Sequence, residues 1–82
     1  MLKIMMLPNK NQFFSIIDRS QGDVFLRLPD NSRTDLKKDS VARQMISLME
    51  KRIPDGLQID LNDQADAAPF IHYMAQAAQM SR

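Results

Sequence analysis

The stretch that most constrains the fold is residues 39–52, the clearest amphipathic helix pattern in the chain. Asp39 or Ser40 can accept hydrogen bonds from the free amides of a first helical turn. Lys51 and Arg52 would place positive charge where the helix dipole is negative. The proline that follows closes the helix, because it disfavours helical geometry in the residue before it. Apolar residues recur here at i, i+4 and i+7/8 spacing and predict one buried stripe: Val41, Met45, Leu48, Met49 and Ile53.

The rest of the chain is predicted to form strands and helices that cover this stripe. Strands are expected at residues 2–7, 23–28, 33–36 and 57–61, and further helices at residues 13–20 and from Asp66 to about Gln79. Residues 13–20 also fit a strand, since the run is short and bulky. Residues 2–7 are apolar on both faces apart from Lys3, which predicts a strand away from an exposed sheet edge.

The polar segment 33–36 is expected at an edge of the sheet. Asp66 is a plausible N-cap for the last helix, and Pro69 would then lie in its first turn, where a missing amide hydrogen costs nothing. The inner face of that helix is predicted to contain Ile71, Met74, Ala75 and Ala78, flanked by Phe70 and Ala77.

The predicted element order is therefore β-α-β-β-α-β-α within a single domain, residues 1–82. Such a short chain must use every apolar face. The economical solution has two layers, a four-stranded antiparallel sheet with all helices on one face, which is an α+β fold.

Charge and composition exclude several classes of protein. A net charge of +1 argues against strong general affinity for nucleic acid, which needs many phosphate neutralisations. The chain has no cysteine, so it offers neither a disulfide framework nor a thiolate metal site. No run approaches the roughly 20 apolar residues needed to span a bilayer. We expect a soluble, cytoplasmic domain without a cofactor.

Three stretches resemble the histidine-containing phosphocarrier (HPr) family of the sugar phosphotransferase system. Residues 23–26, D-V-F-L, are similar to the second strand of that family. Residues 40–48, from Ser40 through M-I-S-L, are similar to its serine-led second helix. Residues 56–59 and 66–74 resemble its fourth strand and its acid-capped last helix. The resemblance covers roughly residues 22–78 and implies an open-faced sandwich with strand order 1-4-2-3.

Two positions matter for what the resemblance implies about function. The phosphoacceptor motif of the family, G-L-H-A-R-P, has no counterpart here, and Gln12 lies about where the histidine would be. An amide nitrogen is not nucleophilic, so phosphoryl transfer is expected to be absent. Ser40 matches the regulatory serine of the family, where a phosphate would lie at a helix N-terminus. Capping preference alone accounts for a serine at this place, and a capping or first-turn role is the favoured interpretation.

Other candidate residues give weaker indications of chemistry. His72 is the only histidine, and it is expected to be a solvated surface residue and not a catalytic or phosphoacceptor group. Asp60 and Asp63 lack the remaining pattern of a calcium loop. No nucleophile–base pair, glycine-rich phosphate loop or paired carboxylates are found, so we expect neither an enzyme nor a metal site.

The sequence leaves two hypotheses for function. The first is a regulatory or protein-interaction module of HPr type that docks partners through the second helix. The second is a small nucleic-acid-binding module that uses a basic cluster, although a solvated face is the favoured interpretation of that cluster. The docking residues predicted for the first are Val41, Ala42 and an exposed Ile46, and the basic cluster of the second is Arg33, Lys37, Lys38 and Arg43.

Overall fold

The computed structural model describes residues 2–80, with side chains as far as Ala78. Its elements follow the predicted order, with one short 3-10 helix added before the last helix. They are β1 (Leu2–Met6), α1 (Lys10–Arg19), β2 (Val24–Arg27), β3 (Arg33–Asp35), α2 (Ser40–Ser47), β4 (Arg52–Leu61), η1 (Gln64–Asp66) and α3 (Ala67–Met80).

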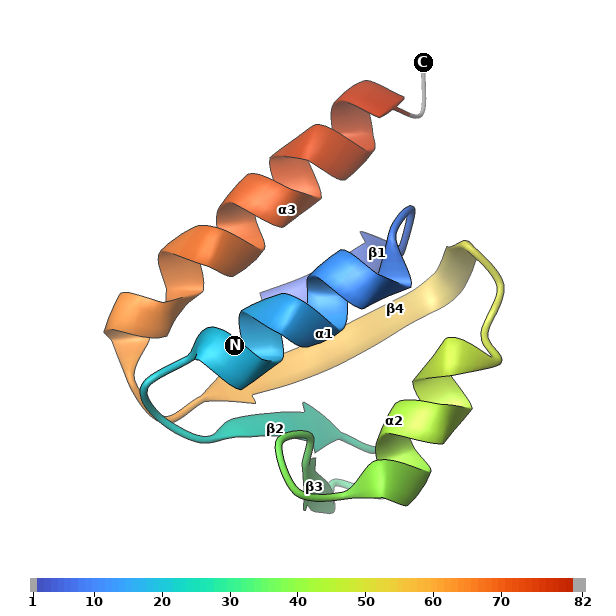
Figure 1. The fold of residues 1–82 in the computed structure, drawn as a ribbon. Helices are drawn as coiled ribbons and strands as arrows, with labels where there is room; N and C mark the ends of the chain where they lie inside the picture. Colours follow the sequence, from blue (N-terminus) through green and yellow to red (C-terminus); the bar gives the residue numbers. More distant parts are fainter. Residues whose placement is uncertain (1, 81–82) are drawn as a thin grey trace.

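The four strands form one antiparallel sheet in the order β1-β4-β2-β3. The three α-helices lie over one face of this sheet (Figure 1). Inward residues of neighbouring strands are aligned, because Ile59 of β4 is opposite both Leu2 of β1 and Leu26 of β2. The predicted α+β open-faced sandwich and its strand order are confirmed.

The predicted position of β1 inside the sheet is wrong, because β1 is an edge strand that pairs only with β4. Its apolar side chains face two different environments. Ile4 points into the core and is fully buried, whereas Met5 on the opposite face is exposed. An apolar composition on both faces therefore did not require a second neighbouring strand. The polar strand β3 does lie at the other edge, as predicted.

Strand β4 is longer than predicted and includes the expected turn at residues 54–56. The pairing with β1 shifts register between Ile4 and Met6, so that Met6 is opposite Arg52. Gly56 has φ +74° at this irregularity, a backbone conformation that favours glycine. The bulge lets the chain pair on either side of Pro54, whose missing amide hydrogen would otherwise interrupt a regular ladder.

The core is centred on aromatic rings that join α1 to α3. Phe13 of α1 lies 6.1 Å from Phe70 and 6.0 Å from Tyr73 between ring centroids. All three side chains are buried. The Tyr73 hydroxyl donates to the Asn9 carbonyl at 2.9 Å, which anchors α3 to the start of α1. Burial raises the pKa of the Tyr73 phenol above its usual value, so it remains a neutral donor.

The predicted inner face of α3 is wrong by about one residue. Phe70, Tyr73 and Ala77 are buried, whereas Ile71 and Ala75 are exposed. The two aromatic side chains determine the rotation of the helix, since they remove the most apolar area from water. The alternative stripe of smaller residues is left at the surface.

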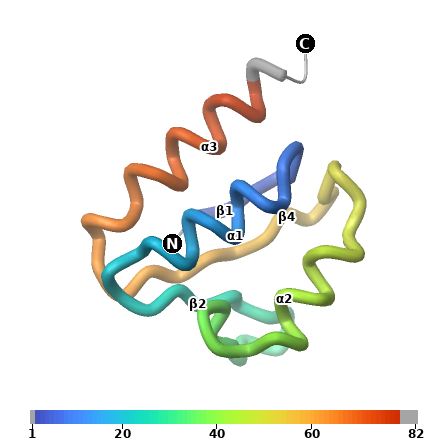
Figure 2. The backbone as a smooth tube through the Cα atoms, viewed as in Figure 1, coloured from blue at the N-terminus to red at the C-terminus, as the bar shows by residue number. Residues whose placement is uncertain are grey.

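Two further boundaries differ from prediction at helix starts. Helix α1 begins three residues early because Asn9 caps it, accepting from the Gln12 amide at 3.0 Å. Asp66 does not cap α3. Its carboxylate instead accepts from the backbone amides of Gln21 and Gly22 at 2.9 and 2.8 Å. The loop after α1 therefore lies against the start of α3, as the backbone trace shows (Figure 2).

Candidate functional site

The strongest candidate for a functional surface is α2, and its first turn is fixed by Asp39. The Asp39 carboxylate accepts from the amides of Val41 at 3.0 Å and Ala42 at 3.1 Å, and from the Thr34 hydroxyl at 2.5 Å. The Thr34 hydroxyl and then the backbone amides hold the pKa of Asp39 below its usual value. Asp39 is thus the N-cap, and Ser40 is the exposed first residue of the helix.

The end of α2 differs from the prediction, because the helix stops at Ser47 and not near Arg52. The Lys10 ammonium donates to the carbonyls of Ser47, at 2.9 Å, and Met49. This side chain from α1 satisfies carbonyls that a longer helix would have used internally. The Leu7 amide donates to the Lys51 carbonyl at 2.7 Å, and the chain then enters β4.

The two apolar faces of α2 are exchanged relative to the prediction. The predicted buried stripe of Val41, Met45 and Leu48 is wrong, because these side chains are exposed, and the Ile46 side chain, predicted to be exposed, is buried. Ala42 and Ile46 are buried against the core, so the predicted docking role of their side chains lacks the exposure that it needs. The exposed apolar residues are Val41 (65%), Met45 (52%) and Leu48 (79%). Both sets have helical spacing and lie on neighbouring faces of the same helix. Only the position of α2 over the sheet decides which set is covered. Val41 alone among the predicted docking residues remains accessible.

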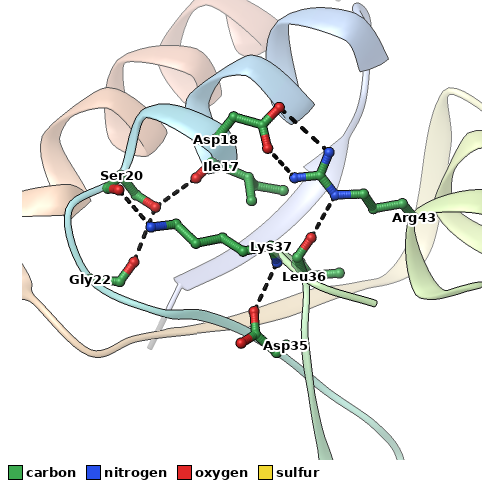
Figure 3. Close-up of polar contacts among 8 residues, drawn as sticks. All are labelled: Ile17, Asp18, Ser20, Gly22, Asp35, Leu36, Lys37 and Arg43. Atoms are coloured by element: carbon green, nitrogen blue, oxygen red, sulfur yellow. Dashed lines mark hydrogen bonds and ion pairs between the residues drawn. The ribbon is translucent and has the colours of Figure 1, made fainter. Parts of the chain in front are cut away.

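The rotation of α2 is held by Arg43, which bridges three parts of the molecule (Figure 3). Its Nε donates to the Leu36 carbonyl at 2.6 Å, and its guanidinium forms an ion pair with Asp18 of α1. The same guanidinium lies 5.5 Å from the centroid of the Phe14 ring. These contacts keep the Ala42–Ile46 face turned inward.

The predicted basic cluster is not a set of four free cations. Arg43 is engaged as described, and the Lys37 ammonium donates to the Ser20 carbonyl at 2.6 Å (Figure 3). Arg33 lies 4.8 Å from the centroid of the Phe25 ring. Lys38 is exposed. Three of the four side chains therefore have structural contacts within the fold.

A cavity of ≈ 500 Å³ adjoins the exposed face of α2. It lies between the helix, the β2–β3 turn and the first half of β4. Met45 of α2 and Met49, which follows the end of the helix, form one wall of it. Methionine side chains are flexible enough to adapt to different apolar groups. The other apolar residues that line it are Leu26, Leu28, Pro29, Ile53 and Leu57.

The position of the missing phosphoacceptor lies near the start of α1. Gln12 is an exposed residue in the first turn, and its side-chain amide donates to Gln76 of α3 at 3.5 Å. The side-chain amide nitrogen of Gln76 lies 3.2 Å from Nε2 of the His72 ring. His72 is exposed, as expected, and the fold brings it near Gln12 through Gln76. Because Gln12 and His72 are far apart in sequence, their proximity could not be predicted. It follows from the antiparallel packing of α1 and α3.

Residues 2–80 also bear on two other classes of site. No group of three or more His, Cys, Asp or Glu residues in this part of the chain could hold a metal ion. Within the same residues, no helix is both long enough and apolar enough to cross a membrane.

Comparison with known proteins finds no matching family model, no matching curated protein and no matching solved structure. The resemblance to HPr therefore remains an expectation, carried by residue patterns and by the strand order that they implied.

Proposed function

We propose that this domain is a non-catalytic protein-interaction module of HPr type, with its docking surface on α2. The observation that carries the proposal is the exposed apolar row of Val41, Met45 and Leu48, which we call the α2 stripe. Val41 and Met45 lie one turn apart on α2, and Leu48, the C-cap residue, extends the same row. Contiguous exposed apolar patches of this kind mark interaction sites more often than isolated residues do.

The cavity beside the stripe supports the same role. Met45 belongs both to the stripe and to the cavity wall, so a partner that covers the stripe has an apolar recess at its margin. Interface energy concentrates where a side chain fills a desolvated pocket. A partner helix that lies along α2 and places one apolar residue in the cavity fits this shape.

The non-catalytic part of the proposal is based on Gln12. A carboxamide in place of an imidazole offers neither a nucleophile nor a group that exchanges a proton near pH 7. His72 lies close by, and its ring contact goes to Gln76, a neutral amide, and not to a carboxylate that would orient it for transfer.

Ser40 gives the module a candidate point of regulation. Its side chain is exposed at the first position of α2, one residue before the stripe begins. A phosphate there would lie beside the Asp39 carboxylate, which already accepts from the amides of Val41 and Ala42, and would add negative charge next to Val41. We propose that modification of Ser40 would alter partner affinity without refolding the helix.

Partner capture from the source cell tests the docking surface. The wild-type domain is compared with Leu48→Glu, Met45→Glu and the matched control Gln44→Glu, which adds the same charge at an exposed polar position of the same helix. Loss of one specific partner with the first two variants, but not with the control, is expected. Equal recovery by all four proteins would refute docking through α2. Ser40→Asp then tests regulation, and an unchanged affinity would remove Ser40 from the proposal.

A phosphotransfer assay tests the non-catalytic claim. The domain is incubated with the general phosphotransfer enzyme and radiolabelled phosphoenolpyruvate, and no label is expected on the protein. Label on His72, lost in His72→Ala, would overturn the claim.

A further inference from the structure

We infer that the partner segment is a helix with two recognition groups: an apolar anchor residue for the cavity beside α2, and a lysine or arginine for the Asp55 carboxylate at its rim. The inference rests on the proposed function, since it names the chemistry of the partner that docks on α2. Its evidence is the charge around the cavity and not the α2 stripe, so the two proposals can fail separately.

The cavity reaches from the exposed face of α2 to the core of the domain. Leu26 of β2 and Leu57 of β4 are buried core residues, and both line it. Met45 lines it at the exposed side. Its volume of ≈ 500 Å³ lies within the roughly 300–1,000 Å³ typical of ligand pockets. An apolar side chain of a partner can therefore be removed from water there without displacing any part of the fold.

The lining of the cavity carries one uncompensated charge, and that charge is negative. Among residues 2–80, the two charged residues that line it are Arg27 and Asp55. The Nε and Nη2 atoms of Arg27 donate to Oδ2 of Asp60 at 3.2 and 3.0 Å, so the positive charge is paired. The Asp55 side chain is exposed, and it has no hydrogen bond or ion pair with any residue in the described part of the chain.

A second carboxylate lies in the turn that borders the cavity. Asp30 is placed between Pro29 and Asn31, which both line the cavity. Its carboxylate accepts from the Ser32 hydroxyl at 2.6 Å and from the Ser32 amide at 3.0 Å. These hydrogen bonds hold the pKa of Asp30 below its usual value, so this group is negative at neutral pH. The turn side of the rim thus has the same sign as the β4 side.

The cations that are closest in sequence do not neutralise this rim. Arg33, which follows the turn, lies over the ring of Phe25, and neither residue lines the cavity. Lys51 lines a separate hollow together with Lys10. Arg52 begins β4 and does not line the cavity. A positive charge beside Asp55 must therefore come from a partner.

A partner helix can supply the apolar anchor and the cation from one face. Residues three or four positions apart on a helix lie about 5–6 Å apart at their Cβ atoms. A lysine or arginine at that distance from the anchor stays at the rim while the anchor enters the cavity. Its alkyl chain can cover apolar surface, and its charged group remains in water beside Asp55. An acidic residue at the same position would face a like charge and be rejected.

Selection from a displayed library of random peptides, about four helical turns long, tests the chemistry of the partner. The target is the whole domain. Selected peptides should carry Leu, Ile, Phe or Met with Lys or Arg three or four positions away. The net charge of the domain is +1, so general attraction for basic peptides would not produce this enrichment. Enrichment of acidic or uncharged peptides, or no enrichment, would overturn the inference.

Charge reversal at Asp55 identifies the group that binds the basic residue. Affinity for a synthetic copy of the most enriched peptide should fall about threefold in Asp55→Asn and at least about tenfold in Asp55→Lys. A new selection against Asp55→Lys should return Asp or Glu in place of the basic residue.

The matched control is Glu50→Lys, which makes the same charge change at an exposed residue that does not line the cavity. It should alter affinity less than about twofold at 0.1 M salt, where charges are screened beyond about 10 Å. Equal losses in Asp55→Lys and Glu50→Lys would overturn the inference, because long-range charge alone would then explain the preference. Circular dichroism confirms that each variant is folded.

Variants of the α2 stripe separate this inference from the proposed function. Loss of peptide binding in Met45→Glu and Leu48→Glu, with full binding in Asp55→Lys, would retain docking through α2 and overturn the need for a basic residue. Loss in Asp55→Lys, with full binding in Leu48→Glu, would support recognition of the basic residue and remove the stripe from the proposed function. A wild-type dimer in sedimentation equilibrium that Met45→Glu dissociates would make a second copy the occupant and would overturn the inference.

Discussion

Helix α1 is held to α3 and to α2 by two different kinds of contact. Toward α3 it presents Phe13, whose ring packs against the buried Phe70 and Tyr73. Toward α2 its contacts involve charged groups: Asp18 pairs with Arg43, whose guanidinium also lies over the Phe14 ring, and Lys10 donates to carbonyls at the other end. Apolar contact depends little on salt or pH, whereas partly exposed ion pairs depend on both. The α3 side should therefore be the rigid part of the molecule, and α2 the adjustable part.

The largest expected effect is at the aromatic contact. Phe70→Ala should lower the free energy of unfolding by about 3–5 kcal/mol, because it leaves a cavity beside Phe13. Urea denaturation measures the change. The neighbouring Ile71→Ala removes an exposed side chain and should cost less than about 1 kcal/mol. Similar losses in both variants would contradict the observed rotation of α3.

The next effect concerns Asp66, which joins the start of α3 to the loop after α1. Hydrogen bonds from the amides of Gln21 and Gly22, and then the charge of Lys37, hold the pKa of this carboxyl below its usual value. A lowered folded-state pKa gives stability that is present above about pH 4 and is lost as the pH falls through the folded value. Asp66→Asn should therefore reduce the loss of stability as the pH falls below about 4.

Thermal unfolding at a series of pH values measures this dependence. Asp55→Asn is the matched control, since Asp55 is exposed and has no resolved contact of this kind. An unchanged acid limb in Asp66→Asn would show that other carboxyls control acid unfolding.

A smaller effect is expected at Arg43. Arg43→Ala removes the hydrogen bond to the Leu36 carbonyl, the ion pair with Asp18 and the contact with Phe14. We expect a loss of about 1–2 kcal/mol in the free energy of unfolding. Hydrogen exchange should rise in α2 more than in α3. Equal acceleration in both helices would contradict the division into rigid and adjustable parts.

The smallest effect is expected at Asp18, whose carboxylate is more than half exposed. Asp18→Asn should cost about 0.5 kcal/mol at low salt, because exposed pairs contribute little. In 1 M salt the difference from wild type should vanish, since the Debye length is then about 3 Å. A salt-independent loss would mean that Asp18 acts through something other than its charge.

The extent of successful prediction from the sequence differs between the fold and the site. Element order, fold class and the edge position of β3 followed from local patterns, and the structure confirms them. The candidate docking face did not follow, because α2 carries two apolar stripes on adjacent faces. Ala42 and Ile46 fit the rules for burial as well as Val41 and Met45 do. Local periodicity shows that a helix has an apolar face, but it does not show which of two apolar faces is buried.

The sequence alone determined where most strands and helices form, because strand alternation, caps and turns act over a few residues. Asp39 capped α2 as its residue type predicts. Tertiary structure decided which faces are covered and where α2 stops. Lys10, far away in sequence, donates to the carbonyls of Ser47 and Met49 at the point where α2 ends. Phe13 determines that the aromatic face of α3 is buried. The free energy gained by burying a helix face is summed over contacts with residues that are distant in sequence, so a short segment does not reveal it. Tertiary structure thereby placed the α2 stripe at the surface.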